Sequence, residues 1–191
     1  MKEEKQMVSL EVKLMHIKNK SLNIRDAVQS DAAILCAWWN DGKVMAHAGF
    51  PKGLNTTVQE VTKQIMASND QFRLLIIEAD GIPIGEMNYR LTGPETAEMG
   101  IKICDFSFQG KGYGTILIQM LVKHLFEQLN MRRICLDTNL KNVRAQHVYE
   151  KCGFKKIRVN KDVWVDQLGV WQTSVDYELT KNDYLGKTRK G

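Results

Sequence analysis

The chemistry of this chain is suggested first by a glycine-rich loop that stands ahead of a helix. Gly110, Gly112 and Gly114 alternate along residues 105–115, and glycine lets a backbone turn sharply and approach a ligand because it has no Cβ. Apolar residues with helical spacing follow over residues 116–129. Free backbone N–H groups and the positive end of the helix dipole would therefore converge on one point, where a phosphate group binds well.

Spacing excludes two familiar kinds of phosphate-binding loop. A P-loop carries a glycine five residues before the glycine of its Gly-Lys pair, and none stands there ahead of Gly110-Lys111. A dinucleotide-binding turn that begins at Gly112 needs a small residue at position 117, which is leucine, and it follows the first strand of a βαβ unit. The loop is therefore of a third kind.

A second stretch with regularly spaced functional groups covers residues 138–154. Asn142 and Tyr149 are seven residues apart, so on a helix they share one face about 10 Å apart, with the small residue Ala145 between them. Gly153 stands where a C-terminal glycine would end that helix. The spacing predicts a helix that presents a carboxamide and a phenol to the same ligand.

Together the two stretches resemble the signatures of GNAT-type N-acetyltransferases. The segment Gln109-Gly-Lys-Gly-Tyr-Gly114 is similar to the loop that holds the pyrophosphate of coenzyme A in that family. Residues 139–154 match its Asn-x-x-Asn-x-x-Ala-x-x-x-Tyr-x-x-x-Gly-Phe pattern at every signature position. The resemblance is specific for about residues 95–155 and looser elsewhere.

The resemblance implies an enzyme that moves the acetyl group of acetyl-CoA to a primary amine by direct attack in a ternary complex. In that family, Tyr149 would lie near the sulfur and protonate the departing thiolate. The residues that it implies for binding acetyl-CoA are Met99, Ile101, Ile103, Gln109, Gly110, Lys111, Gly112, Tyr113, Gly114, Thr115, Asn139, Asn142, Ala145 and Tyr149.

The reaction also needs a group that takes a proton from the amine. A lysine-like amine has a pKa of ~10.4, so its deprotonation at neutral pH costs ~4 kcal/mol. Glu98 is our candidate catalytic base, with Glu86 or a water molecule as alternatives. For the acceptor amine we predict binding by residues 36–55 and 160–171, which include His47 and Trp164, and principally by Trp38, Trp39, Asp41 and Glu86.

The acceptor itself is left open by the sequence. We expect a small amine or a peptide or protein N-terminus, and rank an aminoglycoside lower because residues 160–171 offer only Asp162 and Asp166 as acidic groups. A reading from another class is a non-catalytic, regulatory module that binds acyl-CoA. The paired Asn142 and Tyr149 argue against that module.

The strands and helices that must position these residues follow one another along the chain in the order that the resemblance implies. It predicts an α/β (α+β) fold with a mixed, largely antiparallel sheet of six to seven strands, helices on both faces, and a splay between strands 97–104 and 133–138. Strands are expected at residues 22–25, 72–79, 82–91, 97–104, 133–137, 154–159 and 174–179. Residues 21–182 would form one domain, between an extension or extra strand over 1–20 and a tail over 183–191.

Composition argues against several other classes of protein. The 191 residues are 43% hydrophobic and 26% charged, which is typical of a globular domain, and the net charge of +5 is too dispersed for a nucleic-acid-binding face. Four widely spaced cysteines indicate reduced thiols and a cytoplasmic protein, and the four histidines have no metal-ligand spacing. No apolar run reaches ~18 residues, so we expect no membrane span. A homodimer is compatible with the resemblance.

Overall fold

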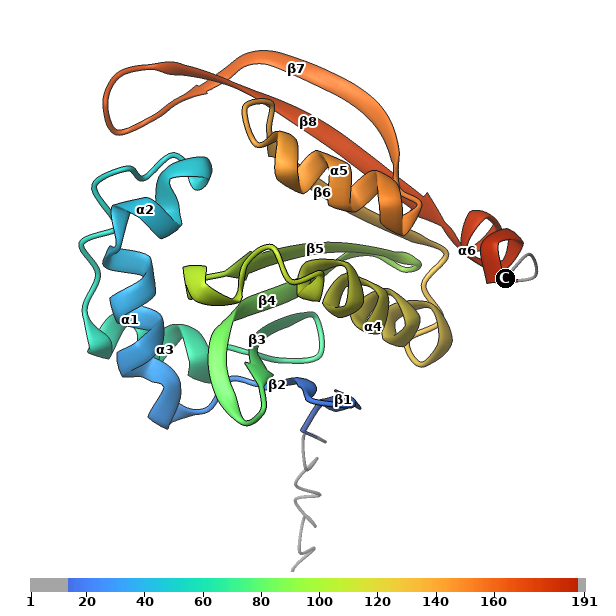
Figure 1. Cartoon of the computed structure of the whole chain (residues 1–191), viewed down its shortest axis with the longest axis horizontal. Helices are drawn as coiled ribbons and strands as arrows, with labels where there is room; N and C mark the ends of the chain where they lie inside the picture. Colours follow the sequence, from blue (N-terminus) through green and yellow to red (C-terminus); the bar gives the residue numbers. More distant parts are fainter. Residues whose placement is uncertain (1–13, 189–191) are drawn as a thin grey trace, which may run out of the picture.

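A computed structural model describes residues 14–188, whose strands form one eight-stranded sheet (Figure 1). The strands lie in the order β1-β2-β3-β4-β5-β6-β8-β7, and β5 and β6 are parallel whereas the other neighbours are antiparallel. The strands are β1 (His16–Asn19), β2 (Leu22–Asp26), β3 (Phe72–Ala79), β4 (Ile82–Gly93), β5 (Thr96–Ile103), β6 (Arg133–Asn139), β7 (Lys155–Val165) and β8 (Trp171–Thr180).

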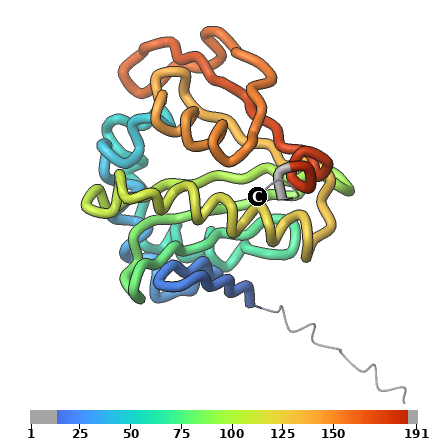
Figure 2. The backbone as a smooth tube through the Cα atoms, turned by 45° about the vertical axis from the view of Figure 1, so that its right-hand side comes forward, coloured from blue at the N-terminus to red at the C-terminus, as the bar shows by residue number. Residues whose placement is uncertain are grey.

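Helices cover both faces of the sheet. On one face α4 and α5 pack side by side, and on the other face α1 and α3 pack against each other (Figures 1 and 2). The α-helices are α1 (Ala32–Asn40), α2 (Gly42–Met45), α3 (Val58–Met66), α4 (Tyr113–Glu127), α5 (Val143–Cys152) and α6 (Lys181–Thr188). Three short 3₁₀ turns complete the chain: η1 (Gln29–Asp31), η2 (Ala46–Ala48) and η3 (Phe106–Phe108).

Period-two alternation along the strands places a separate apolar core on each face. The larger core joins the sheet to α4 and α5 through side chains such as Leu121, Leu136 and Tyr177, all at most 3% exposed. The smaller core joins Leu74 and Ile76 of β3 to Leu35 and Val61 of α1 and α3. A sheet held from both sides is a rigid support for residues at its centre.

The sheet opens at its centre, between β5 and β6. Their pairing is limited to Thr96–Glu98 of β5 and Arg133–Cys135 of β6, although β5 continues to Ile103 and β6 to Asn139. Beyond these three pairs the strands diverge, so backbone groups of residues 99–103 and 136–139 face a gap instead of each other. This confirms the predicted splay, and it sets the place where a ligand can enter the sheet.

Several boundaries differ from those expected. The sheet has eight strands instead of six to seven, because His16–Asn19 adds the edge strand β1 beside β2. The strands expected at 154–159 and 174–179 are longer than predicted, since β7 continues to Val165 and β8 begins at Trp171, so most of residues 160–171 is strand. The expected C-terminal tail overlaps α6, and the part of the predicted extension over residues 1–13 lies outside the described residues. The domain limits stay a prediction.

Within residues 14–188, no helix combines the length and apolar character that crossing a membrane requires.

Candidate active site

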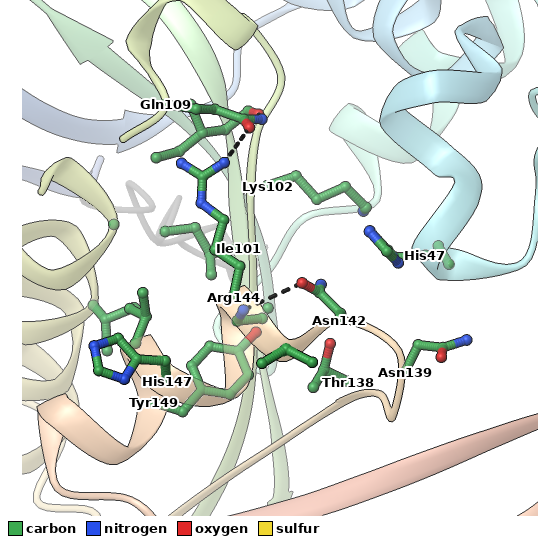
Figure 3. Close-up of a pocket in the computed structure, with 18 of the residues that line it drawn as sticks. His47, Ile101, Lys102, Gln109, Thr138, Asn139, Asn142, Arg144, His147 and Tyr149 are labelled. Atoms are coloured by element: carbon green, nitrogen blue, oxygen red, sulfur yellow. Dashed lines mark hydrogen bonds between the residues drawn. The ribbon is translucent and has the colours of Figure 1, made fainter. Parts of the chain in front are cut away.

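A cavity of about 960 Å³ occupies the gap between β5 and β6. Its walls are residues 100–103 of β5, the glycine loop, the start of α4, residues 137–139 of β6, and one face of α5. The far end is bounded by Lys43, Val44, His47 and Ala48 from α2 and η2, and by Trp164 from β7. Figure 3 shows this arrangement, with Tyr149 and Asn142 on one side and His47 and Lys102 across from them.

The glycine loop has the conformation that only glycine adopts at low cost. Gly110 and Gly112 have φ angles of 78° and 80°, in the left-handed region, and Gly112 is the residue that caps α4. A Cβ built at either residue would meet no atom within 4 Å, so both glycines border open space. The first N–H groups of α4 have no acceptor within the helix. This cradle suits the pyrophosphate of coenzyme A.

A side-chain bridge fixes the loop to both walls of the cavity. Gln109 donates from Nε2 to the carbonyl oxygen of Ile103 at 2.8 Å, and its Oε1 accepts from Arg144 Nη1 at 2.6 Å (Figure 3). The amide therefore ties the loop to the end of β5, while Arg144 ties it to the first turn of α5. Two elements that are far apart in sequence thus hold the cradle at one position.

Helix α5 begins and ends where its spacing predicts. Asn142 caps its first turn by accepting from the backbone N–H of Ala145 at 3.2 Å, and Gly153 ends it with a φ of 103°. Asn139 stands just before this helix, where its Nδ2 donates to Gln172 of β8 at 2.9 Å. Both asparagines line the cavity, and both orient the backbone around it, because Asn139 Oδ1 also accepts from the N–H of Lys141 at 2.9 Å.

Tyr149 lies on the inner face of α5 with 6% of its surface exposed. Its ring packs edge-on against Tyr177, with the ring centres 5.6 Å apart, and its hydroxyl points into the cavity (Figure 3). Among residues 14–188 no partner for a hydrogen bond to this hydroxyl is found. Burial raises the pKa of Tyr149 well above its ordinary value, and the nearby carboxylate of Asp137 adds to the shift. The phenol is therefore protonated at neutral pH and can donate.

Three carboxylates near the cavity have different surroundings. Glu86 on β4 is 2% exposed, and its two oxygens accept from Lys102 Nζ at 2.7 Å and from Trp39 Nε1 at 2.8 Å. Glu98 is exposed on β5, opposite Arg90, and it does not line the cavity. Asp137 does line it. The residue is exposed to the solvent, but partial desolvation by nearby protein atoms and the like charges of Asp176 and Glu98 raise its pKa.

The far end of the cavity is bounded in part by Trp164 of the β7–β8 hairpin. The Trp164 ring packs on Gly49, where an added Cβ would come within 2.2 Å of the ring. At the hairpin tip, Gln167 accepts from the N–H of Lys52 at 2.9 Å and donates to the carbonyl oxygen of Gly53 at 2.8 Å. These two hydrogen bonds join the hairpin to the segment that follows η2, so both lie over the same end of the cavity.

The structure brings together most of the residues expected to bind acetyl-CoA. Of the fourteen, only two do not line the cavity: Met99 is buried in the core, and Lys111 lies over the Phe108 ring at 4.8 Å. The lining members are Ile101, Ile103, Gln109, Gly110, Gly112, Tyr113, Gly114, Thr115, Asn139, Asn142, Ala145 and Tyr149.

The residues expected to bind the acceptor are placed differently. Trp38 packs with the smaller core, and Trp39 donates a hydrogen bond to Glu86. Asp41 caps α2 by accepting from the N–H of Lys43 at 2.8 Å. None of these, nor Glu86, lines the cavity, whereas His47 and Trp164 do.

Sequence reasoning did not single out Asp137 or Arg144, and it covered Lys43 only within the range 36–55. Asp137 precedes the second family signature, residues 139–154, and Arg144 lies within it. That position in the sequence was the signal by which both could have been predicted to line the cavity.

Comparison with known proteins gives the family. The model of the "Acetyltransferase (GNAT) domain" family matches residues 21–155. An aminoglycoside N(6')-acetyltransferase type 1 of Klebsiella pneumoniae is 28% identical over 153 residues, which cover 72% of this chain and 76% of that protein. A spermidine N(1)-acetyltransferase of Vibrio cholerae is 28% identical over 142 residues, or 71% and 80% of the two chains.

Among solved structures, a ribosomal-protein α-N-acetyltransferase (RimL) in complex with coenzyme A superimposes with a TM-score of 0.78. The match covers 87% of this chain and 98% of that one at 19% identity, so it establishes the fold.

Proposed function

The chain belongs to the GNAT family of acetyltransferases, and from this premise we propose which of its residues act and which acceptor it takes. It is an acetyl-CoA-dependent N-acetyltransferase. The observation that carries the assignment of roles is the opening between β5 and β6, which has the glycine cradle at one end and the Tyr149 hydroxyl on its wall.

We assign acetyl-CoA to this opening. The backbone N–H groups of residues 109–115 would bind the pyrophosphate, because the dipole of α4 and the positive φ angles of Gly110 and Gly112 favour an anion there. Ile101 and Ile103 would offer main-chain groups to the pantetheine arm. Tyr149 would protonate the sulfur as the thioester breaks, because its hydroxyl lies in the cavity, carries its proton at neutral pH and has no hydrogen-bond partner among residues 14–188.

For the acceptor we favour a small amine or a peptide N-terminus. Lys43, Lys102, Lys141, Arg144 and Lys151 line the cavity, and Asp137 is its one carboxylate among the described residues. A polycation such as an aminoglycoside would meet like charge there, although the relative from Klebsiella pneumoniae carries that name. An aminoglycoside is therefore the second candidate, with the family relationship as its support.

The test is release of free thiol from acetyl-CoA in the presence of separate acceptors: benzylamine, spermidine, kanamycin, and a short peptide with a free N-terminus. We expect turnover with benzylamine or the peptide, and less with kanamycin. Tight binding of acetyl-CoA without thiol release for any acceptor would favour the non-catalytic module. Fastest release with kanamycin would reverse the order of the two acceptor classes.

A further inference from the structure

Resting on the proposed function, we propose that Asp137 is the general base that takes the proton from the acceptor amine. Asp137 stands on β6 two residues beyond Cys135, the last residue of that strand paired with β5. Its neighbours Leu136 and Thr138 are buried, so alternation along the strand turns Asp137 to the opposite face, where it borders the cavity. The same cavity contains the Tyr149 hydroxyl, and the two groups interact electrostatically.

The carboxylate of Asp137 is free to accept a proton. Within the described part of the chain, it forms no ion pair and no hydrogen bond with another residue. A base must reach the substrate nitrogen directly or through one water, which an unpaired carboxylate on the cavity wall can do.

The two glutamates are less suited to that role. Both oxygens of Glu86 are already acceptors for Lys102 and Trp39, and the residue is 2% exposed. Glu98 lies outside the lining of the cavity. Its charge instead acts on Asp137, because like charge disfavours the ionised form of a neighbouring carboxyl group.

The surroundings of Asp137 strengthen it as a base. Protein atoms around it and the charges of Asp176 and Glu98 raise its pKa, and a carboxylate of higher pKa removes a proton from an ammonium group more readily. The other titratable or charged groups that border the same cavity come from five places: Tyr149, His147, Arg144 and Lys151 from α5, Lys141 before it, Tyr113 from α4, Lys102 from β5, and Lys43 and His47 from α2 and η2.

The proton balance of the reaction is complete with these residues. Asp137 takes one proton from the ammonium group, and the freed nitrogen lone pair forms the C–N bond to the thioester carbonyl carbon. As the C–S bond breaks, its electron pair stays on sulfur, which receives the proton of Tyr149. The second proton lost by nitrogen restores the Tyr149 hydroxyl, and Asp137 releases its proton to water.

The deciding experiment measures kcat against pH for the full chain and for Asp137→Asn with the acceptor that the thiol-release panel identifies. Asp80→Asn is the matched control, because Asp80 lies in the exposed turn between β3 and β4. At pH 7 we expect Asp137→Asn to lower kcat by about 10²–10⁴-fold while the Kd for coenzyme A is unchanged. The loss should shrink as the pH approaches ~10.4, the pKa of a free amine, because the acceptor then needs no base.

Two further readouts separate a catalytic role from a structural one. Carboxyl NMR titration of the free protein should place the pKa of Asp137 above the ordinary ~3.9 of aspartate. Asp176→Asn should move the acidic limb of the wild-type kcat profile to lower pH, because it removes one like charge beside Asp137.

Each outcome bears on the proposal. Wild-type turnover in Asp137→Asn, a loss of equal size at every pH, or an Asp137 pKa at or below ~3.9 would each overturn the role of Asp137 and leave the acetyltransferase assignment intact. Absence of thiol release by the wild-type protein with every amine would remove the proposed function and this role with it.

Discussion

The substitution Gly112→Ala tests whether the glycine loop binds phosphate through a backbone conformation that other residues adopt only with strain. Gly112 has a φ of 80°, and a Cβ added there would meet nothing within 4 Å. The cost to folding is therefore backbone strain without a clash, about 1–2 kcal/mol for an L-residue in the left-handed region. For a chain of this length the Tm should fall by about 2–8 °C.

The same substitution should also weaken coenzyme A binding. Relaxation of the strained residue would turn the N–H groups at the start of α4 away from the pyrophosphate. A hydrogen bond to a charged group contributes about 1.5–3 kcal/mol, so loss of one should raise the Kd for coenzyme A by about 10–100-fold. Calorimetry measures both quantities: the Tm by thermal scans and the Kd by titration with coenzyme A.

Gly81→Ala is the matched control. Gly81 has a φ of 79°, also with nothing within 4 Å of an added Cβ, but it lies in the turn between β3 and β4, away from the cavity. It should lower the Tm by a similar amount and leave the Kd for coenzyme A unchanged. An unchanged Tm for Gly112→Ala would refute the strain argument, and an unchanged Kd would refute phosphate binding at this loop.

Three other substitutions test separate parts of the site. Tyr149→Phe should lower kcat by about 10²–10⁴-fold and change the free energy of unfolding by less than about 0.5 kcal/mol, since the hydroxyl makes no hydrogen bond with the described residues; undiminished turnover in stopped assays would exclude it as the acid. Trp39→Phe should cost about 1–3 kcal/mol in urea unfolding, because it leaves one oxygen of buried Glu86 without its donor; full stability would show that water replaces the indole. Asp137→Asn should raise the Tm near pH 8, because folding raises the pKa of Asp137 and the folded state therefore loses stability as the pH rises through that pKa. The gain in Tm should vanish in acid, below the ordinary pKa of aspartate. An equal gain in Tm at all pH values would contradict the electrostatic cause.

The second signature was predictable from sequence because its structure is local. Ala145 and Tyr149 lie on a single helix and Asn142 is its N-cap, so the 3.6-residue period and the capping position fix their common side. The sharp turn of the glycine loop was also predictable, since glycine permits the positive φ angles that Gly110 and Gly112 adopt; the residue type does not say which glycines adopt them, and Gly114 does not.

The carboxylates were not predictable, because their environments depend on contacts between distant elements. Both oxygens of Glu86 accept hydrogen bonds, one from Trp39, which is 47 residues away, and one from Lys102 on the adjacent strand. Asp137 reaches the cavity because pairing between β5 and β6 stops at Cys135, a property of the sheet that no local pattern encodes. The length of β7 was also underestimated, because irregularities near Arg158 and between Asn160 and Trp164 interrupt its alternation.

The measurement that tests the central claim most directly is a crystal structure of the protein with acetyl-CoA bound. We predict electron density for the pyrophosphate at the backbone N–H groups of residues 109–115, the pantetheine arm between β5 and β6, and the sulfur within hydrogen-bond reach of the Tyr149 hydroxyl. Density for the pyrophosphate elsewhere, or a sulfur out of reach of Tyr149, would contradict the account.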